Sequence, residues 1–195
     1  MRIIAGDYKG RVLKAPKTRA TRPTSDRARE TLFNVLAHAD WAPGFEGAQV
    51  LDLFAGSGAL GFEALSRGGA RAVFVDNTRP AQQAIKDNIT ALKLGARANL
   101  LNRNATSLGP REAVSDAPFD LIFLDPPYGK GLVEPCLTGL LGGDWAGPDS
   151  LIIAETGAKE TLNWQDIHPE GARLDCVNDK SSGAAKFWFL KVVAG

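Results

Sequence analysis

The chain has 195 residues, of which 44% are hydrophobic and 23% are charged, as is ordinary for one globular domain. Its two cysteines, Cys136 and Cys176, exclude a disulfide-rich scaffold and a zinc site built from thiolates. No apolar run approaches the roughly 20 residues of a membrane helix, and residues 1–11 lack the apolar segment of a secretory signal. We therefore expect a cytoplasmic protein with free thiols and no membrane contact.

The net charge of +1 conceals an uneven distribution along the chain. Residues 1–29 contain nine Lys or Arg and two Asp, so this segment carries +7 and the remaining residues carry −6. Clustered basic side chains suit contacts with phosphate groups. We expect this segment to meet a polyanion, and a solvated basic arm without a partner is the alternative.

The first 48 residues predict an arm followed by one helix. Residues 2–5 and 11–14 flank a glycine-containing turn, which predicts a short hairpin or an extended arm. Residues 23–26 are of the types that begin a helix, and apolar residues continue this helix to about His38.

From residue 49 onward, apolar strands alternate with amphipathic helices. The expected strands are residues 50–54, 72–75, 98–101, 119–124 and 151–155, followed by two more within 172–193. One helix is expected after Gly58, and two more are expected at residues 79–94 and 132–141. Near-continuous apolar strands of this kind are typical of a parallel sheet that helices cover on both faces. The last two strands lack a long helix between them, which predicts an antiparallel hairpin at one edge.

Residues 56–61 match the pattern Gly-x-Gly-x-x-Gly directly after the first core strand. Such glycines allow a tight turn and the close approach of a ligand to the backbone. Asp76 ends the next strand, where a carboxylate can accept hydrogen bonds from ribose hydroxyls. These features suit a dinucleotide and S-adenosylmethionine (SAM) about equally, and a purely structural loop is a third interpretation. Asp52 favours SAM, because a carboxylate suits an ammonium and a sulfonium better than a pyrophosphate.

Asp125, Pro126, Pro127 and Tyr128 follow the fourth core strand. The two prolines remove two N–H donors, so this turn offers hydrogen-bond acceptors beside an aromatic ring. The Asp125 carboxylate and the Pro126 carbonyl could each accept one N–H of an exocyclic amino group and aim its nitrogen at a methyl donor. Tyr128 could stack on a base that has left its helix, whereas a strand-ending turn without a ligand is the alternative. Glu155, at the end of the fifth strand, is expected to have a structural or solvated role.

Several motifs resemble those of a known family. Asp52-Leu-Phe-Ala-Gly-Ser-Gly and Asp125-Pro-Pro-Tyr resemble the cofactor and catalytic motifs of class I amino-methyltransferases. The N-terminal motifs resemble those of the RsmD family, the bacterial 16S rRNA guanine-N2 methyltransferases: Arg2-Ile-Ile-Ala-Gly, Lys9-Gly-Arg, Arg22-Pro-Thr-Ser-Asp-Arg and Arg29-Glu-Thr-Leu-Phe-Asn-Val-Leu. The resemblance spans nearly the whole chain, in motif order and in length.

This resemblance implies an α/β, Rossmann-like, SAM-dependent methyltransferase fold, with a mostly parallel seven-stranded sheet and one antiparallel strand at the edge. Residues 1–48 would form a basic extension that contacts RNA and flanks the cofactor site, and residues 49–195 would form the methyltransferase domain. The implied cofactor-binding residues are Asp52, Phe54, Gly56, Gly58, Asp76, Asn104 and Ala105. The implied catalytic residues are Asp125, Pro126, Pro127 and Tyr128. The expected RNA-binding residues are Arg2, Lys9, Arg11, Arg22 and Arg27.

Two further implications concern individual positions. Many members of the wider superfamily carry Asp where this chain has Asn104, which alters the expected contact with the adenine of the cofactor. Thr24, Arg27, Phe33 and Asn34 would flank the cofactor or the target base.

The implied reaction moves a methyl group from SAM to the N2 amino group of a guanine in small-subunit rRNA, within a partly or fully assembled ribosomal particle. We expect a monomer that uses no metal. The alternatives are amino-methylation of DNA at adenine N6 or cytosine N4 or of another RNA, an NAD-dependent oxidoreductase, and a non-catalytic RNA-binding module. DNA-specific enzymes generally need an added recognition domain, for which 48 N-terminal residues leave little room. An oxidoreductase would need a proton-relay group at a strand end, and the sequence shows none.

Overall fold

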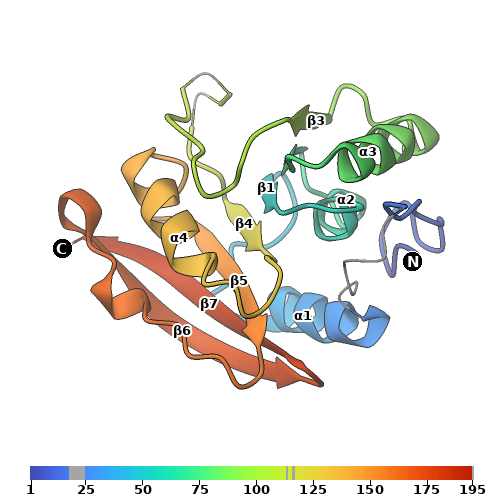
Figure 1. Cartoon of the computed structure of the whole chain (residues 1–195). Coiled ribbons are helices and arrows are strands. Elements are labelled where there is room, and N and C mark those ends of the chain that lie inside the picture. The colour runs from blue at the N-terminus through green and yellow to red at the C-terminus, as the bar shows by residue number, and fades with distance from the viewer. Residues whose placement is uncertain (18–24, 113, 116, 195) are drawn as a thin grey trace.

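One seven-stranded sheet organises the chain in the computed structural model, which describes residues 1–17, 25–112, 114–115 and 117–194 (Figure 1). The strands are β1 (Gln49–Leu53), β2 (Arg71–Val75), β3 (Ala98–Leu101), β4 (Leu121–Leu124), β5 (Leu151–Gly157), β6 (Ala172–Ser182) and β7 (Ala185–Ala194). The α-helices are α1 (Asp26–His38), α2 (Ala59–Ser66), α3 (Arg79–Leu92) and α4 (Val133–Gly142). Two short 3₁₀ turns, Trp164–Asp166 and Pro169–Gly171, precede β6.

The strand order is β3-β2-β1-β4-β5-β7-β6, and β1 to β5 pair in parallel. β7 is antiparallel to both β5 and β6. The predicted α/β fold with a mostly parallel sheet and an edge hairpin is therefore confirmed. The reversed strand lies second from the edge, because β6 pairs along the outer side of β7.

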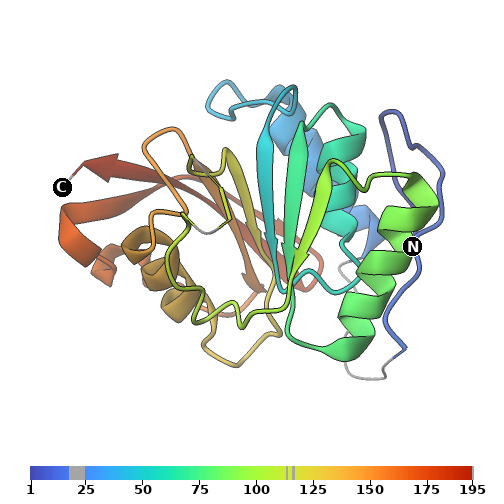
Figure 2. The ribbon, with the colours of Figure 1, turned by 90° about the horizontal axis from the view of Figure 1, so that it is seen from above.

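Side chains alternate between two apolar clusters, one on each face of the sheet. In β4, Leu121 and Phe123 join one cluster, and Ile122 and Leu124 join the other. Helices α1, α2 and α3 and the N-terminal arm cover the first face, and α4 covers the second (Figure 2). Both faces are thus buried, as the near-continuous apolar strands predicted.

The N-terminal arm is a short hairpin, as predicted. Arg2 and Val12 form an antiparallel bridge. The residues that follow these two partners, Ile3 and Leu13, are buried in the same apolar cluster as residues of α1 and α2. The arm therefore contributes to the core although most of its charged side chains face solvent.

Buried polar side chains fasten the arm to the helices. The fully buried carboxylate of Glu63, in α2, accepts hydrogen bonds from the backbone N–H groups of Ile4 (2.7 Å) and Ala5 (3.0 Å). Asn88, in α3, accepts from the N–H of Lys14 (2.8 Å) and donates to its carbonyl (3.0 Å). Because unpaired buried polar groups are costly, these contacts fix where the arm lies.

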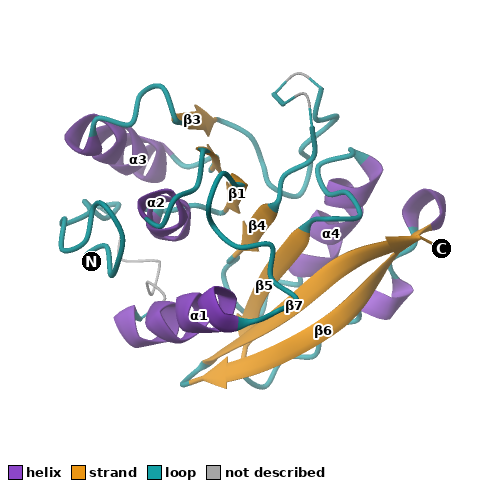
Figure 3. Cartoon of the chain, turned by 180° about the vertical axis from the view of Figure 1, so that it is seen from behind, coloured by secondary structure: helices purple, strands orange, loops and turns teal. Residues whose placement is uncertain are grey.

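Helix α1 begins where its sequence predicted. The Ser25 hydroxyl accepts a hydrogen bond from the N–H of Ala28 (3.1 Å), which is ordinary N-cap chemistry. Arg29 is fully buried, pairs with Asp26 (2.7 Å) and donates to the carbonyl of Arg2 (3.0 Å). This arginine joins α1 to the arm on the same face of the sheet (Figure 3).

Candidate active site

Parallel pairing brings three strand ends together at one edge of the sheet. The last residue of β1 pairs with the last residues of β2 and β4, so Phe54, Asp76 and Asp125 leave the sheet side by side. The negative charges of Asp125 and Asp76 both act on Asp52, in agreement with this placement. The glycine loop and the Asp125 turn, which the sequence analysis expected to meet, therefore lie next to each other.

Helix α2 packs so tightly on the sheet that two glycines have no room for a side chain. A Cβ atom on Gly61 would lie 2.5 Å from the Phe74 ring. A Cβ on Gly58 would lie 2.6 Å from the Phe62 ring, and Gly58 also has a φ of +78°. Gly58 and Gly61 thus set the close approach between α2 and β2.

Gly56, in contrast, faces open space. Among the described residues other than its chain neighbours, a Cβ there would meet only the Phe54 carbonyl oxygen within 4 Å, at 3.8 Å. Gly56 (φ +56°) and Phe54 (φ +56°) both hold the left-handed conformation that turns the chain out of β1. A ligand can therefore approach the backbone at Gly56, and the half-buried Phe54 ring packs on the α4 side of the sheet.

Asp52 lies beneath this loop, only 1% exposed. Its Oδ2 atom accepts a hydrogen bond from the N–H of Gly61 (2.9 Å), which fixes the first turn of α2. Burial raises the pKa of Asp52 well above its ordinary value; the Gly61 hydrogen bond opposes this shift, and the charges of Asp125 and Asp76 add to it. The predicted cofactor residue thus shapes the loop from below.

Asp76 ties the glycine loop to the end of β2. Its Oδ2 accepts from the N–H of Gly56 (3.0 Å), and its Oδ1 accepts from the N–H and the hydroxyl of Thr78 (2.8 Å each). Each carboxylate oxygen can accept more than one hydrogen bond. Asp76 is half-buried at this edge, so it keeps capacity for the hydroxyls of a ribose.

The segment after β3 offers one side-chain donor and a fixed backbone. Asn104 is exposed, and its Oδ1 accepts from the N–H (3.1 Å) and hydroxyl (3.0 Å) of Thr106. Its amide nitrogen is therefore the group best placed to meet an adenine. The carbonyl of the buried Ala105 accepts from the Cys136 thiol of α4 (3.2 Å). Burial raises the pKa of Cys136 to about 12, so this thiol stays protonated. Cys136 and Cys176 are both free, as predicted.

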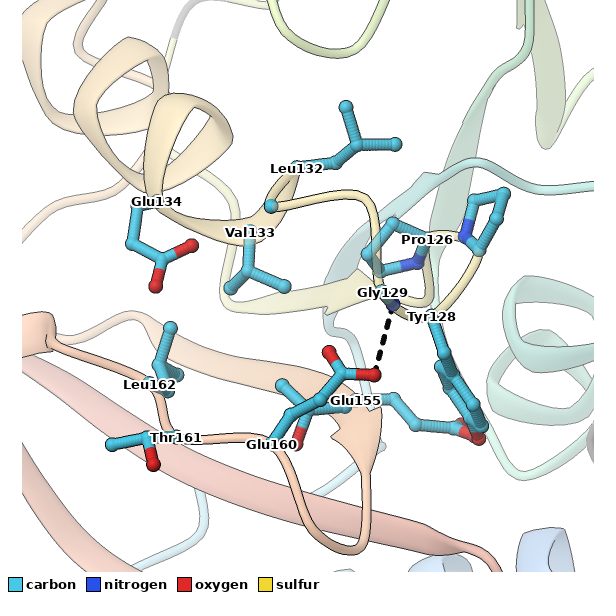
Figure 4. Close-up of a pocket in the computed structure, with 13 residues that line it drawn as sticks. Pro126, Tyr128, Gly129, Leu132, Val133, Glu134, Glu155, Glu160, Thr161 and Leu162 are labelled. Atoms are coloured by element: carbon cyan, nitrogen blue, oxygen red, sulfur yellow. Dashed lines mark hydrogen bonds between the residues drawn. The ribbon is translucent and has the colours of Figure 1, made fainter.

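The Asp125 turn is held to β5 and to the loop after it (Figure 4). The Tyr128 hydroxyl donates a short hydrogen bond to Oε1 of Glu155, in β5. The N–H of Gly129 donates to Oε1 of Glu160 (2.9 Å). Partial burial and the Glu155 carboxylate raise the pKa of Tyr128 above its ordinary value, so the phenol remains a donor.

A pocket of about 160 Å³ adjoins this turn. Pro126, Pro127 and Tyr128 form one side, and Glu155 and Glu160 face them across it (Figure 4). The pocket thus combines an aromatic ring, two prolines that lack N–H donors, and carboxylate acceptors. Asp125 directly precedes it, half-buried, on the side of the glycine loop.

Two expectations from the sequence need correction. Of the two roles expected for Glu155, the solvated one is wrong and the structural one holds: its side chain is 2% exposed, accepts the Tyr128 hydrogen bond and lines the pocket. The reason is that β5 continues to Gly157, beyond its predicted end at residue 155. Phe33 does not border the site, because it is fully buried and its ring packs against Phe45 and Phe123. Glu160 was not anticipated, since no local pattern marks it.

The predicted RNA-binding residues occupy separate places. Arg2, Lys9, Arg11 and Arg27 are exposed, and Arg22 lies outside the described residues, as does Thr24. The tip of the arm contacts the C-terminal ends of α2 and α3: the N–H of Asp7 donates to the Ser66 carbonyl (2.8 Å), and Arg11 Nη2 donates to the Ala91 carbonyl (3.0 Å). Lys9 and Arg11 therefore lie far from the glycine loop, which precedes α2, whereas Arg27 lies at the start of α1.

Within the described residues, no group of three or more His, Cys, Asp or Glu side chains could hold a metal ion. No helix in the same part of the chain is long and apolar enough to cross a membrane.

The strand order with a reversed β7, the glycine loop after β1 and the acidic residue after β2 define a Rossmann-like methyltransferase. A family model described as "Conserved hypothetical protein 95" matches residues 1–191. The chain therefore belongs to this family, the RsmD family.

Individual relatives agree with this assignment. The chain is 41% identical over 175 residues to Ribosomal RNA small subunit methyltransferase D of Escherichia coli strain K12, covering 87% of this chain and 83% of the relative. It is 35% identical over 188 residues to the protein of the same name from Haemophilus influenzae, covering 96% and 91%. The solved structure of yhhF from Escherichia coli has a TM-score of 0.76 at 35% identity, covering 100% of this chain and 99% of the other.

Methyltransferases of this family use SAM as the methyl donor. The residues of this chain fit such a group, because Gly56 leaves its backbone open to a ligand and Asp76 offers carboxylate oxygens beside it. The Asn104 amide nitrogen adds a donor from the segment after β3.

Proposed function

We propose that this protein methylates the exocyclic N2 amino group of a guanine in small-subunit rRNA. The observation that carries this proposal is the Asp125–Tyr128 turn, in which two prolines without N–H groups stand between a carboxylate and an aromatic ring, set beside the glycine loop. The substrate class is supported by relatives named for small-subunit rRNA methylation. An assembled or partly assembled ribosomal particle is the form of that RNA that we propose as substrate.

The residues that would hold SAM are those of the glycine-loop side. Gly56 and Gly58 would bring the backbone close to the methionine part, Asp76 would accept hydrogen bonds from the ribose, and Asn104 and Ala105 would meet the adenine. Asp52 would set the loop from beneath, and the positive charges of the cofactor would favour its carboxylate form against the burial that raises its pKa. When bound, SAM supplies an electrophilic methyl group on a sulfonium.

The Asp125 turn would orient the amino group that receives the methyl. A guanine amino group has two N–H bonds, and the Asp125 carboxylate and the Pro126 carbonyl could accept one each. The nitrogen lone pair is then left to face the methyl donor. Because a conjugated amino group is a weak nucleophile, this turn would contribute mainly through orientation and hydrogen-bond polarisation. Asp125 is also the group placed to take the released proton, directly or through water.

The pocket beside the turn supports guanine rather than adenine as the base. Tyr128 would stack on the base once it has left its helix, a contact worth roughly 1–3 kcal/mol that offsets the opening. Glu155 and Glu160 place carboxylate oxygens on the opposite wall. Guanine carries N–H donors at both N1 and N2, whereas the N1 of adenine would bring a lone pair toward these oxygens.

Transfer of a labelled methyl group tests the proposal directly. The protein is incubated with methyl-labelled SAM and either free small-subunit rRNA or assembled small subunits from cells that lack the protein. The RNA is then digested to nucleosides. We expect label in N2-methylguanosine, with more incorporation into the particle than into free RNA. Label in another nucleoside, or none with either RNA while SAM binds, would overturn the proposal.

A further inference from the structure

A polar hollow of about 380 Å³ lies between the start of α1 and the tip of the β6–β7 hairpin, apart from the pocket described above. Figures 1 and 3 both show this tip beside α1. Two cations line the hollow, Arg27 from α1 and Lys180 from β6. The hydroxyl side chains that line it are Ser25, Thr31, Ser181 and Ser182.

The hollow is built by two segments that are distant in the sequence. The Ser182 hydroxyl donates to the Thr31 hydroxyl across the gap (3.5 Å), and Thr31 in turn donates to the Arg27 carbonyl (2.9 Å). The hairpin turns back at Gly183, whose φ of +63° suits glycine. The relative position of the two walls is thus set by the fold.

The charged side chains that line the hollow are both positive. No carboxylate occurs among the described residues that line it. Asp179 pairs with Lys186 (3.2 Å) and Asp26 pairs with the buried Arg29 (2.7 Å), whereas Glu30, the residue before Thr31 in α1, does not line the hollow. Within the described part of the chain, neither Arg27 nor Lys180 forms an ion pair. Two cations surrounded by hydroxyl groups are the donor set that a phosphate group requires.

The reversal of β7 places this hollow at the active edge. The start of β7 pairs with the end of β5, so Ala185 lies opposite Gly157 and Phe187 lies opposite Glu155. The hairpin tip therefore lies at the same edge of the sheet as the Asp125 turn. The tip of the basic arm, by contrast, contacts the far ends of α2 and α3.

From these observations we infer that the hollow binds a phosphodiester group of the RNA strand that carries the target guanine. This inference rests on the proposed function and adds a second contact region to it. Arg27 and Lys180 neutralise the phosphate, and the hydroxyl groups of Ser25 and Ser181 donate to its oxygens. The strand would then run along the active edge, from the pocket toward the hairpin.

The test is the salt dependence of binding to a small-subunit rRNA fragment. The double variant Arg27→Gln/Lys180→Gln is compared with the wild-type protein and with Arg173→Gln, an exposed cation near the other end of β6. Two lost phosphate contacts should reduce the slope of log K against log salt by about 1.4, at 0.7 for each contact with a single strand. The KM for RNA should rise, whereas the affinity for SAM and the thermal midpoint should match those of the control.

A matched pair at one position isolates the charge of the hollow. Ser181→Glu places a carboxylate in the hollow, and Ser181→Gln places a neutral group of the same shape there. We expect Ser181→Glu to weaken RNA binding and Ser181→Gln to change it little.

The possible failures differ in what they overturn. If the wild-type protein methylates the RNA while the double variant keeps the slope and KM of Arg173→Gln, the phosphate site is wrong and the proposed function stands. If the wild-type protein transfers no methyl group to guanine N2, the proposed function fails and this inference fails with it.

Discussion

The two loops of the candidate active site are held in opposite ways. The glycine loop is fixed by contacts of the core, with Gly61 against Phe74 and its N–H on the buried Asp52. The Asp125 turn is held near the surface by single hydrogen bonds to Glu155 and Glu160. We conclude that changes on the cofactor side should alter the stability of the fold, whereas changes on the base side should alter catalysis alone.

The largest expected effect is kinetic and lies on the base side. Asp125→Ala should lower methyl transfer by about 10²–10⁴-fold, the usual range for removing a group positioned on the reacting atoms. SAM should still bind, because the glycine loop is held by other residues. Single-turnover transfer and calorimetry with SAM measure the two properties separately. Normal turnover by this variant would refute the catalytic assignment.

The comparison predicts a stability effect on the cofactor side. Gly61→Ala should destabilise the protein by roughly 1–3 kcal/mol, because its Cβ would lie 2.5 Å from the Phe74 ring. Gly139→Ala is the matched control, since this glycine of α4 has nothing within 4 Å of its Cβ position. That control should gain about 0.5–1 kcal/mol from helix propensity. Denaturant unfolding measures both variants, and equal shifts would contradict the packing argument.

A smaller effect is expected from the hydrogen bond of the turn. Tyr128→Phe keeps the ring but loses the donor to Glu155, so kcat/KM should fall about fivefold, equivalent to roughly 1 kcal/mol. The thermal midpoint and the affinity for SAM should not change. Tyr8→Phe, at the other tyrosine of the chain, serves as the control. A fall in SAM affinity with Tyr128→Phe would show that the two sides are not independent.

The smallest effect is a pH dependence that belongs to the glycine-loop side. The pKa of Asp52 is raised in the folded state, so proton binding at Asp52 stabilises the folded protein. This contribution to the free energy of unfolding is fully present below the ordinary pKa of 3.8 and is lost as pH rises through the raised pKa. Asp52→Asn removes this titration while its amide oxygen can still accept from Gly61. The free energy of unfolding of the variant, relative to the wild type, should therefore rise as pH increases from 3.8 to the raised pKa. If the free energies of unfolding of the variant and of the wild type changed with pH in the same way, this assignment would be contradicted.

The fold was predictable because its signals are local and repeated. β2 and β4 are apolar runs that Asp76 and Asp125 directly follow, and Ser25 marks the start of α1 by its own hydrogen bond. The meeting of the glycine loop with the Asp125 turn followed from parallel pairing alone.

Contacts between distant segments were harder to predict. Glu155 receives a hydrogen bond from a residue 27 positions away, and nothing near it in the sequence indicates that partner. The burial of Phe33 depends on Phe45 and Phe123, which only the packed structure brings to it. Lys180 joins Arg27 in one hollow because the predicted β6–β7 hairpin packs beside α1, and no residue of β6 indicates that neighbour.

The carboxylate of Glu63 has a consequence for how the first residues can be manipulated. Trimming them, by protease or by deletion, would remove two hydrogen-bond donors from this buried carboxylate, which among the described residues would keep only its ion pair with Arg67 (2.8 Å), and would empty the places of Ile3 and Leu13. A shortened protein would then unfold, so a lower affinity for nucleic acid could not be measured separately from the loss of the fold. The first residues of the chain are therefore an integral part of the folded domain.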